Sequence, residues 1–405
     1  MPQSQSKTLL FVCLVTFLDA LGVGLILPVI PDLIRQLTNL PTASAAEISG
    51  YLMFAFAGMQ FFVAPILGGL SDQYGRRPVM LLALFGFSIN YFVMAAAPTL
   101  FWLFVARAFS GLCGATIPTA NACIVDVTTP AERSKLFGLT GAALGLGFIM
   151  GPPVGGLLGE IDYRLPFLVA GCASLAVLVF GYFAFAETLP AERRRQFQWQ
   201  RANPIGSVIQ IARYPAVLSI LIAFFFVQLA SQSYGTIWAF YTMEVAHWSK
   251  WAVGVSAGAY GLLMVLMQGG LTGPVIKRFG EWRTLWFAIG AAIVSFSTLA
   301  FATGPSAIYA GIFVGSFAGF FFPAGQSLMT RGIPENAQGE LQGALASSFC
   351  TAAIISPILM THLFSSFTDG SGIHFPGVPF LAAAALMVCA LLALILRRSH
   401  QTVAN

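Results

Sequence analysis

The sequence contains few charged side chains. Lys and Arg number 20 and Asp and Glu 15, which is 9% of 405 residues, whereas a soluble domain carries about 25%. So few polar groups cannot cover the surface of a water-soluble protein of this length, so that class is excluded. The 57% of hydrophobic residues also excludes a disordered chain. The net charge of +5 is spread over many short segments, so we expect no nucleic-acid partner.

Clustered metal ligands and catalytic motifs are lacking as well. The six cysteines are scattered within apolar runs, without the spacing of a disulfide framework or a metal site. We therefore expect no metal and no cofactor. The segment 254–258 matches G-x-S-x-G, but that motif needs a strand–turn–helix elbow, and here it opens an apolar run. We expect no catalytic residue and no enzyme activity.

Long apolar runs dominate the chain instead. Each is long enough for a membrane-spanning helix, which needs about 20 residues. They are continuous rather than alternating, which is typical of helices and not of an outer-membrane barrel. The sequence therefore predicts an all-α integral membrane protein with 12 transmembrane helices in a lipid bilayer. The runs cover residues 9–33, 48–70, 78–97, 100–124, 136–158, 164–186, 214–242, 252–276, 284–303, 306–329, 339–364 and 377–396.

Basic residues lie mostly on one side of these predicted spans. The side that holds both termini carries sixteen, the opposite side carries Arg35, Arg164 and Lys250, and Arg107 lies within a span. Because cytoplasmic loops are enriched in Lys and Arg, both termini are predicted to be cytoplasmic. The sixteen are Lys7, Arg76, Arg77, Arg133, Lys135, Arg193, Arg194, Arg195, Arg201, Arg213, Lys277, Arg278, Arg283, Arg331, Arg397 and Arg398.

One long polar stretch divides the spans six and six. Residues 187–213 are predicted to be a cytoplasmic linker between an N-terminal six-helix bundle (1–186) and a C-terminal one (214–405). The two halves share a register at an offset of 205 residues. Such parallel repeats place a substrate cavity between the halves near the membrane midplane. The matching pairs are Gly75 and Gly280, Pro118 and Pro323, Gly138 and Gly343, Pro152 and Pro357, and Asp126 and Arg331.

Two groups of residues are candidates for gating. The loop after the second span combines a glycine for a tight reversal with charges able to pair in one conformation and part in another. In the fifth span, glycines at four-residue spacing leave one helix face almost bare, so that a neighbouring helix can approach closely; plain helix packing is the alternative. The candidates are Gly68, Asp72, Gly75, Arg76, Arg77, Asp126, Gly147, Gly151, Pro152, Gly155 and Gly156.

Two charged residues lie inside predicted spans. Asp19 is in the first and Arg107 in the fourth. Charges at membrane depth are costly and by default mark a functional site. Asp19 could bind and release a proton as access alternates, or bond to a broken first helix. Arg107 could take part in the proton path, or snorkel or cap neighbouring carbonyls.

These motifs resemble the major facilitator superfamily. The loop from Gly68 to Pro78 is similar to its signature loop, Arg107 to its fourth-span arginine, and Gly147 to Gly156 to its antiporter motif. The segment 18–31, with Asp19, resembles the first span of bacterial tetracycline efflux transporters in the drug:proton antiporter group. The resemblance covers nearly the whole chain. It implies a proton-coupled exporter of amphipathic drugs, such as tetracycline-like compounds, with proton coupling at Asp19 and Arg107. It also implies a monomer in the bacterial inner membrane.

The chain departs from the tetracycline transporters at three positions. Asn90 and Ala292 stand where they carry acids, and Met264 where they often carry a histidine. These departures weaken the case for a metal–tetracycline substrate. A proton-coupled transporter of a specific metabolite, such as a siderophore, sugar or amino-acid derivative, is the alternative. The polar and aromatic candidates for binding a small organic substrate are Gln60, Asn90, Asn121, Gln228, Gln232, Trp238 and Gln326, with Gln268 as a further amide.

Overall fold

A computed structural model describes residues 3–114, 116–196, 215–334, 338–370 and 372–403. The described residues form helices joined by turns and short loops, with no strand among them. Among these described residues, twelve helical segments are long and apolar enough to cross a membrane. The predicted fold class of 12 membrane-spanning helices is thus confirmed. Of the predicted linker, residues 187–196 are described and 197–213 lie outside the described residues.

The chain forms two compact units, and each includes a short segment from the half of the sequence that mainly forms the other unit. The first contains residues 1–40, 55–202 and 249–258, and the second residues 41–54, 203–248 and 259–405. Helix α3 (Thr42–Tyr74) therefore begins in the second unit and continues in the first. Helix α11 (Lys250–Val265) begins in the first unit and continues in the second.

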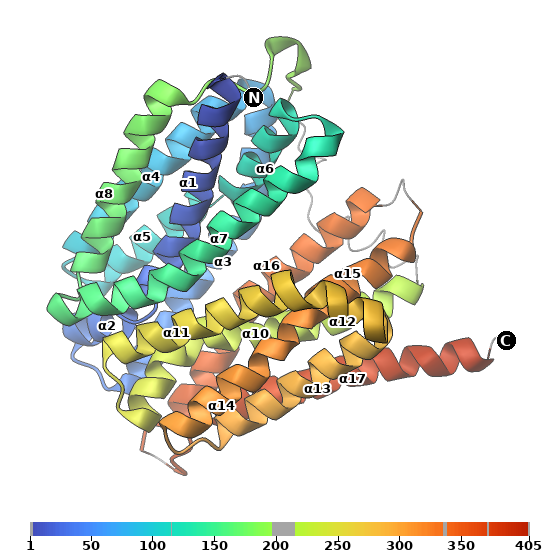
Figure 1. The fold of residues 1–405 in the computed structure, drawn as a ribbon. Helices are drawn as coiled ribbons and strands as arrows, with labels where there is room; N and C mark the ends of the chain where they lie inside the picture. The colour runs from blue at the N-terminus through green and yellow to red at the C-terminus, as the bar shows by residue number, and fades with distance from the viewer. Residues whose placement is uncertain (1–2, 115, 197–214, 335–337, 371, 404–405) are drawn as a thin grey trace. The chain divides into compact units, whose positions relative to one another are not determined.

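In the first unit, α1 packs against α6, α7 and α8, and α4 packs against α5 and α8 (Figure 1). The described start of the linker lies at the same end of this unit as the start of α1 (Figure 1). Besides part of α3 and the start of α11, the unit contains α1 (Gln3–Ile26), α2 (Ile30–Thr38), α4 (Arg76–Ala96), α5 (Leu100–Cys113), α6 (Thr116–Val127), α7 (Pro130–Ile161), α8 (Leu165–Ala184) and the short η1 (Ala191–Arg193).

In the second unit, α10 packs against α16 and α17, and α13 packs against α14 and α17. The elements that complete it are α10 (Pro215–Ala246), η3 (Leu266–Leu271), α12 (Thr272–Phe279), α13 (Glu281–Ala300), α14 (Pro305–Ser316), η4 (Phe317–Phe320), α15 (Phe321–Arg331), α16 (Gln338–Ser366) and α17 (Val378–Val403).

The first span is shorter than the apolar run suggested. The prediction extended it to residue 33, but α1 ends at Ile26 and α2 begins at Ile30. A turn separates the two helices, in which the Leu27 N–H bonds the Gly24 carbonyl at 3.3 Å. Pro28 and Pro31 follow, and proline is favoured at helix starts but not in helix interiors, so the hydrophobic run continues where the helix does not.

Three other spans contain irregular backbone. The fourth breaks between α5 and α6 around Gly114. In the eighth, the π-helical η3 separates α11 from α12, and in the tenth the 3₁₀ segment η4 separates α14 from α15. Inside a bilayer, irregular backbone is tolerated only where protein or a water-filled cavity satisfies its polar groups.

The breaks in the fourth and tenth spans are repeat-related. Gly114 and Gly319 are 205 residues apart, the offset predicted from the sequence. Gly75 and Gly280, also 205 apart, both adopt positive φ angles, of 106° and 79°, immediately before α4 and α13. Glycine is the residue that adopts such angles without strain, so the two units turn in the same way at the same place.

Candidate functional site

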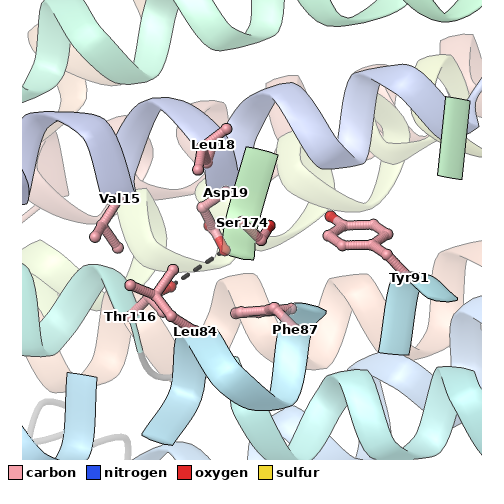
Figure 2. Close-up of a pocket in the computed structure, with 8 residues that line it drawn as sticks. All are labelled: Val15, Leu18, Asp19, Leu84, Phe87, Tyr91, Thr116 and Ser174. Carbon is pink, nitrogen blue, oxygen red and sulfur yellow. Dashed lines mark hydrogen bonds between the residues drawn. The ribbon is translucent and has the colours of Figure 1, made fainter. Parts of the chain in front are cut away.

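Asp19 lies in the interior of α1, whereas the other acids of the described spans lie near the ends of their helices. Its carboxylate is half-buried and accepts a hydrogen bond of 3.1 Å from the Thr116 hydroxyl, on the first residue of α6. Figure 2 shows this bond between two of the residues that line a small cavity. The cavity has a volume of about 10 Å³, about the space that one water molecule needs. The cavity is lined by Val15, Leu18, Asp19, Leu84, Phe87, Tyr91, Thr116 and Ser174.

Tyr91 enters this cavity from α4 (Figure 2). Its hydroxyl lies against the bare Cα of Gly22, where even a methyl group would overlap the oxygen. Gly22 follows Asp19 by one helical turn, so both lie on one face of α1. Tyr91 and Asp19 line the same cavity.

Arg107 lies in the interior of α5, half-buried. Within the described part of the chain its buried Nε has no hydrogen-bond partner. The salt bridges found between described residues do not join Arg107 to Asp19.

The glycine-rich face of α7 packs directly on α1 around Asp19. A side chain at Gly147 would meet the Phe17 carbonyl and Ala20, and one at Gly151 would meet the backbone of Leu21 and Gly24. Bare helix faces let backbones approach to this degree. The stripe thus sets the position of the helix that carries the carboxylate. Gly155 continues the same contact against Leu25.

The start of α11 also packs on α7, within the first unit. A side chain at Gly156 would meet the Lys250 carbonyl. The Lys250 ammonium forms a 2.9 Å salt bridge with Asp32 of α2, and the Trp251 N–H donates to Glu160 at 3.1 Å. These contacts gather at the end of the unit opposite the Asp72–Arg77 loop, because α7 ends there at Ile161.

Arg76 is the centre of a charge cluster at the end of the first unit near the linker. Its guanidinium forms salt bridges of 2.6 Å with Asp72 and 3.1 Å with Asp126, and it also donates to the Ser71 hydroxyl. The cluster joins α3, α4 and α6. Arg77, by contrast, donates to the Tyr182 carbonyl of α8 at 2.7 Å. Three of the predicted gating residues, Asp72, Arg76 and Asp126, therefore meet here, while a side chain at Gly68 would meet open space.

Glu187, the first residue of the predicted linker, caps α4. Its carboxylate accepts the Arg76 N–H at 2.9 Å and the Arg77 N–H at 3.3 Å. The first N–H groups of a helix lack partners within the helix and attract anions. The Arg195 N–H also donates to the Asp72 carbonyl at 3.1 Å. The start of the linker is thus docked on the charged loop.

The second unit contains the repeat-related ion pair with its charges exchanged. Glu281 and Arg331, which correspond to Arg76 and Asp126 at the offset of 205, form a salt bridge of 2.9 Å. This explains why an arginine stands at the position equivalent to Asp126: its partner is exchanged too. The Ser327 hydroxyl donates to Glu281 at 3.2 Å.

The predicted substrate-binding residues are divided between the two units. In the first unit, the Gln60 amide donates to the Gly114 carbonyl at 2.9 Å, Asn90 is buried and Asn121 exposed. In the second unit, Gln228, Gln232 and Gln326 are half-buried. Trp238 is 2% exposed and packs among Tyr234, Tyr241 and Phe380.

Tyr91, Thr116 and Ser174 line the cavity but were not among the site residues predicted from the sequence. All three are polar groups within apolar spans, and the contacts that single them out come from helices distant in sequence. Tyr91 directly follows Asn90, a predicted site residue. Consecutive residues of a helix point about 100° apart, so the two side chains face different neighbours. Tyr91 was therefore a second candidate at the same level of the span. Ser256, in the G-x-S-x-G match, is fully buried inside α11 and donates to the Val253 carbonyl at 2.8 Å.

The family model described as Major Facilitator Superfamily matches residues 12–357. The tetracycline resistance protein, class C, of Escherichia coli is 35% identical over 92% of this chain and 92% of its own. Multidrug resistance protein 2 of Bacillus subtilis (strain 168) is 27% identical over 96% of this chain and 94% of its own.

Solved structures share the fold. The human organic anion transporter MFSD10 (TETRAN) superimposes with a TM-score of 0.71 at 21% identity, covering 97% of this chain and 100% of that one. A bacterial homologue of the human lysosomal transporter Spinster gives a TM-score of 0.79 at 16% identity, covering 98% and 97%.

Proposed function

The chain belongs to the major facilitator superfamily, and we propose that it is a proton-coupled exporter of amphipathic drugs, tetracycline-like compounds or other small organic molecules among them. We place it in the inner membrane of a bacterium, as a monomer with both termini cytoplasmic. The twelve candidate spans and the tetracycline and multidrug resistance relatives support an efflux transporter of this membrane.

The observation that carries proton coupling is the environment of Asp19. A carboxylate in the interior of a span is energetically costly, and such a residue by default marks a functional site. This one has a hydroxyl partner, Thr116, and a cavity of about 10 Å³ beside it. It is in no salt bridge between described residues. Its charge is therefore free to be cancelled by a proton rather than by a fixed cation.

The mechanism follows from alternating access. Asp19 takes up a proton when its cavity communicates with the outside and releases it to the cytoplasm, while substrate moves outward. Loss of the negative charge removes the need for hydroxyl donors such as Thr116, which begins α6 next to the break in the fourth span. Gln60 holds the other side of that break, at Gly114. A change of protonation at Asp19 can therefore affect Gln60, a candidate substrate-binding residue, because Thr116 and Gln60 contact the two sides of the same helix break.

The charge cluster around Arg76 and the glycine face of α7 serve as gating elements in this proposal. The salt bridges of Arg76 tie α3 and α6 to α4. The contact of Gly147 and Gly151 with α1 makes the position of α7 depend on the helix that carries Asp19. Movement of either element is therefore coupled to the proton-binding helix.

Substitution of Asp19 tests the function. Asp19→Asn keeps the shape of the side chain and removes its titration. Dye and drug efflux from cells should fall to the level of a protonophore-treated control, with membrane insertion unchanged. The matched control is Glu192→Gln, an exposed acid of η1, which should leave efflux intact. Normal, protonophore-sensitive efflux by the Asp19→Asn variant would refute proton coupling at this carboxylate.

Transport of a specific metabolite remains the second candidate, and the substitutions at Asn90, Met264 and Ala292 favour it over a metal–tetracycline substrate. Asn90 is buried, and its Nδ2 contacts the Met94 sulfur at 3.7 Å, so it supplies no charge for a metal complex. Inverted membrane vesicles with an imposed pH gradient separate the two by substrate and direction. An exporter accumulates the drug inside such vesicles.

A further inference from the structure

Tyr91 holds a place that the proposed proton exchange at Asp19 leaves unexplained. It is the largest polar side chain in the cavity beside Asp19, and it comes from α4, a helix that carries neither charged residue of the site (Figure 2). Its ring stacks near Phe87, with centroids 6.4 Å apart, which fixes the direction of the side chain along α4.

The position of the hydroxyl depends on Gly22. No side chain other than hydrogen leaves room for the Tyr91 oxygen on α1. Gly22 itself is buried, in a helix where alanine would be favoured by about 1 kcal/mol. The glycine therefore costs helix stability and in exchange admits a hydroxyl one turn from Asp19.

The surroundings of Asp19 contain few other groups able to influence its charge. From α6 it faces the Thr116 hydroxyl, and from α8 the Ser174 hydroxyl, which share the cavity with it. From α7 it faces the glycine stripe, which carries no charge. Arg107 of α5 is not among the residues that line this cavity. Tyr91 is thus the titratable side chain that shares the cavity with Asp19.

We propose that Tyr91 is a positioning residue for proton exchange: its hydroxyl, seated on the bare backbone of Gly22, orients the water that shares the cavity with Asp19 and stabilises the ionised carboxylate. This inference rests on the proposed function of Asp19. A cavity of about 10 Å³ accepts about one water. Such a water gains partners from the tyrosine, the carboxylate and the Ser174 hydroxyl, within the two to four that a buried water requires.

Two substitutions remove this hydroxyl from its position in different ways. Tyr91→Phe deletes the oxygen and keeps the ring. Gly22→Ala keeps the tyrosine and displaces its oxygen. Each should make the ionised carboxylate less stable, so that Asp19 holds its proton to higher pH. The pH profile of substrate-driven proton release from purified transporter should shift upward by about one unit, a tenfold change in proton affinity. Tyr182→Phe, on exposed α8 surface, is the control and should not shift.

The same variants in an Asp19→Asn background separate positioning from a structural role. There, substrate-driven proton release is already lost, and Tyr91→Phe should leave substrate affinity unchanged, whereas a structural role would lower it. An equal fall in rate at every pH, with no shift in the profile of Tyr91→Phe, would overturn the inference even if Gly22→Ala failed to fold. Failure of the proposed function looks different: the wild-type protein would then show no dependence on the pH gradient at all.

Discussion

The exchanged ion pairs predict unequal effects of two equivalent substitutions. Arg76 is buried, with its side chain 10% exposed, and Asp126 is half-buried at 17%, whereas Arg331 is 71% exposed. Removing one partner of a buried pair leaves an uncompensated charge and costs about 3–5 kcal/mol, while an exposed pair contributes about 0–1 kcal/mol. The Arg76→Ala variant also loses the 2.6 Å salt bridge to Asp72. We therefore expect its loss of stability to lie in the higher of these two ranges, about 3–5 kcal/mol.

The assay is thermal unfolding of purified protein in one detergent. Arg76→Ala should lower Tm at least three times as much as Arg331→Ala, the ratio of the two energy ranges. A double-mutant cycle of Arg76→Ala with Asp126→Ala should show a coupling free energy of about 2 kcal/mol. Equal Tm losses for the two arginines, or no coupling in the cycle, would refute the conclusion that the salt bridges of buried Arg76 stabilise the contact between α3, α4 and α6.

Exchanging the first pair to the polarity of the second sharpens the test. The double variant Arg76→Glu with Asp126→Arg restores an opposite-charge pair, yet Asp72 and the cap at Glu187 would then face a third carboxylate. We expect less than half of the lost Tm to return. Full recovery would mean that these neighbouring acids contribute little to the cluster.

Two further predictions concern bonds that tie helices together. Glu187→Ala should lower Tm by the equivalent of about 1–2 kcal/mol, the cost of an N-terminal cap, whereas Glu192→Ala, an exposed residue five positions later, should have no effect in the same assay. Thr116→Val should move the pH profile of proton release upward, because the ionised Asp19 loses a donor, and Thr116→Ser should restore the wild-type profile; an unchanged profile for the valine variant would contradict a role for this bond.

The fold was predictable because membrane spans follow from local composition. Apolar runs report length and number directly, since every span must hide its backbone in the same way. The end of the first span was predicted wrongly for the same reason. Hydrophobicity continues through Ile30 to Leu33, but Pro28 and the turn at Leu27 end the helix at Ile26, and hydropathy does not detect this.

The site was predictable only in part. Asp19 stood out because an acid inside an apolar run is rare. Its partner Thr116 is 97 residues away, and threonine is common in spans, so no local signal connects the two. The role of Glu187 was hidden because an acid in a polar linker is ordinary. Its role depends on a hydrogen bond with the N–H of Arg76 at the start of α4, 111 residues earlier in the chain.

The repeat shows which contacts belong to the fold and which to the proposed chemistry. Asp19 and Thr116 correspond at the offset of 205 to Phe224 and Phe321, whose rings lie 6.3 Å apart in the second unit. The contact between these helices is therefore kept in both units, while a hydrogen-bonded carboxylate in one is replaced by two rings in the other.

The same comparison applies to Tyr91, whose counterpart is Phe296, a ring without a hydroxyl that packs against Tyr234. If the tyrosine served only to fill space, phenylalanine would serve in both units. Its oxygen lies instead against Gly22, whereas the counterpart of that glycine is Val227. The glycine and the hydroxyl thus occur together in the unit that has the carboxylate and are both missing from the unit that lacks it, a pattern that supports the proposed role beside Asp19 over helix packing alone.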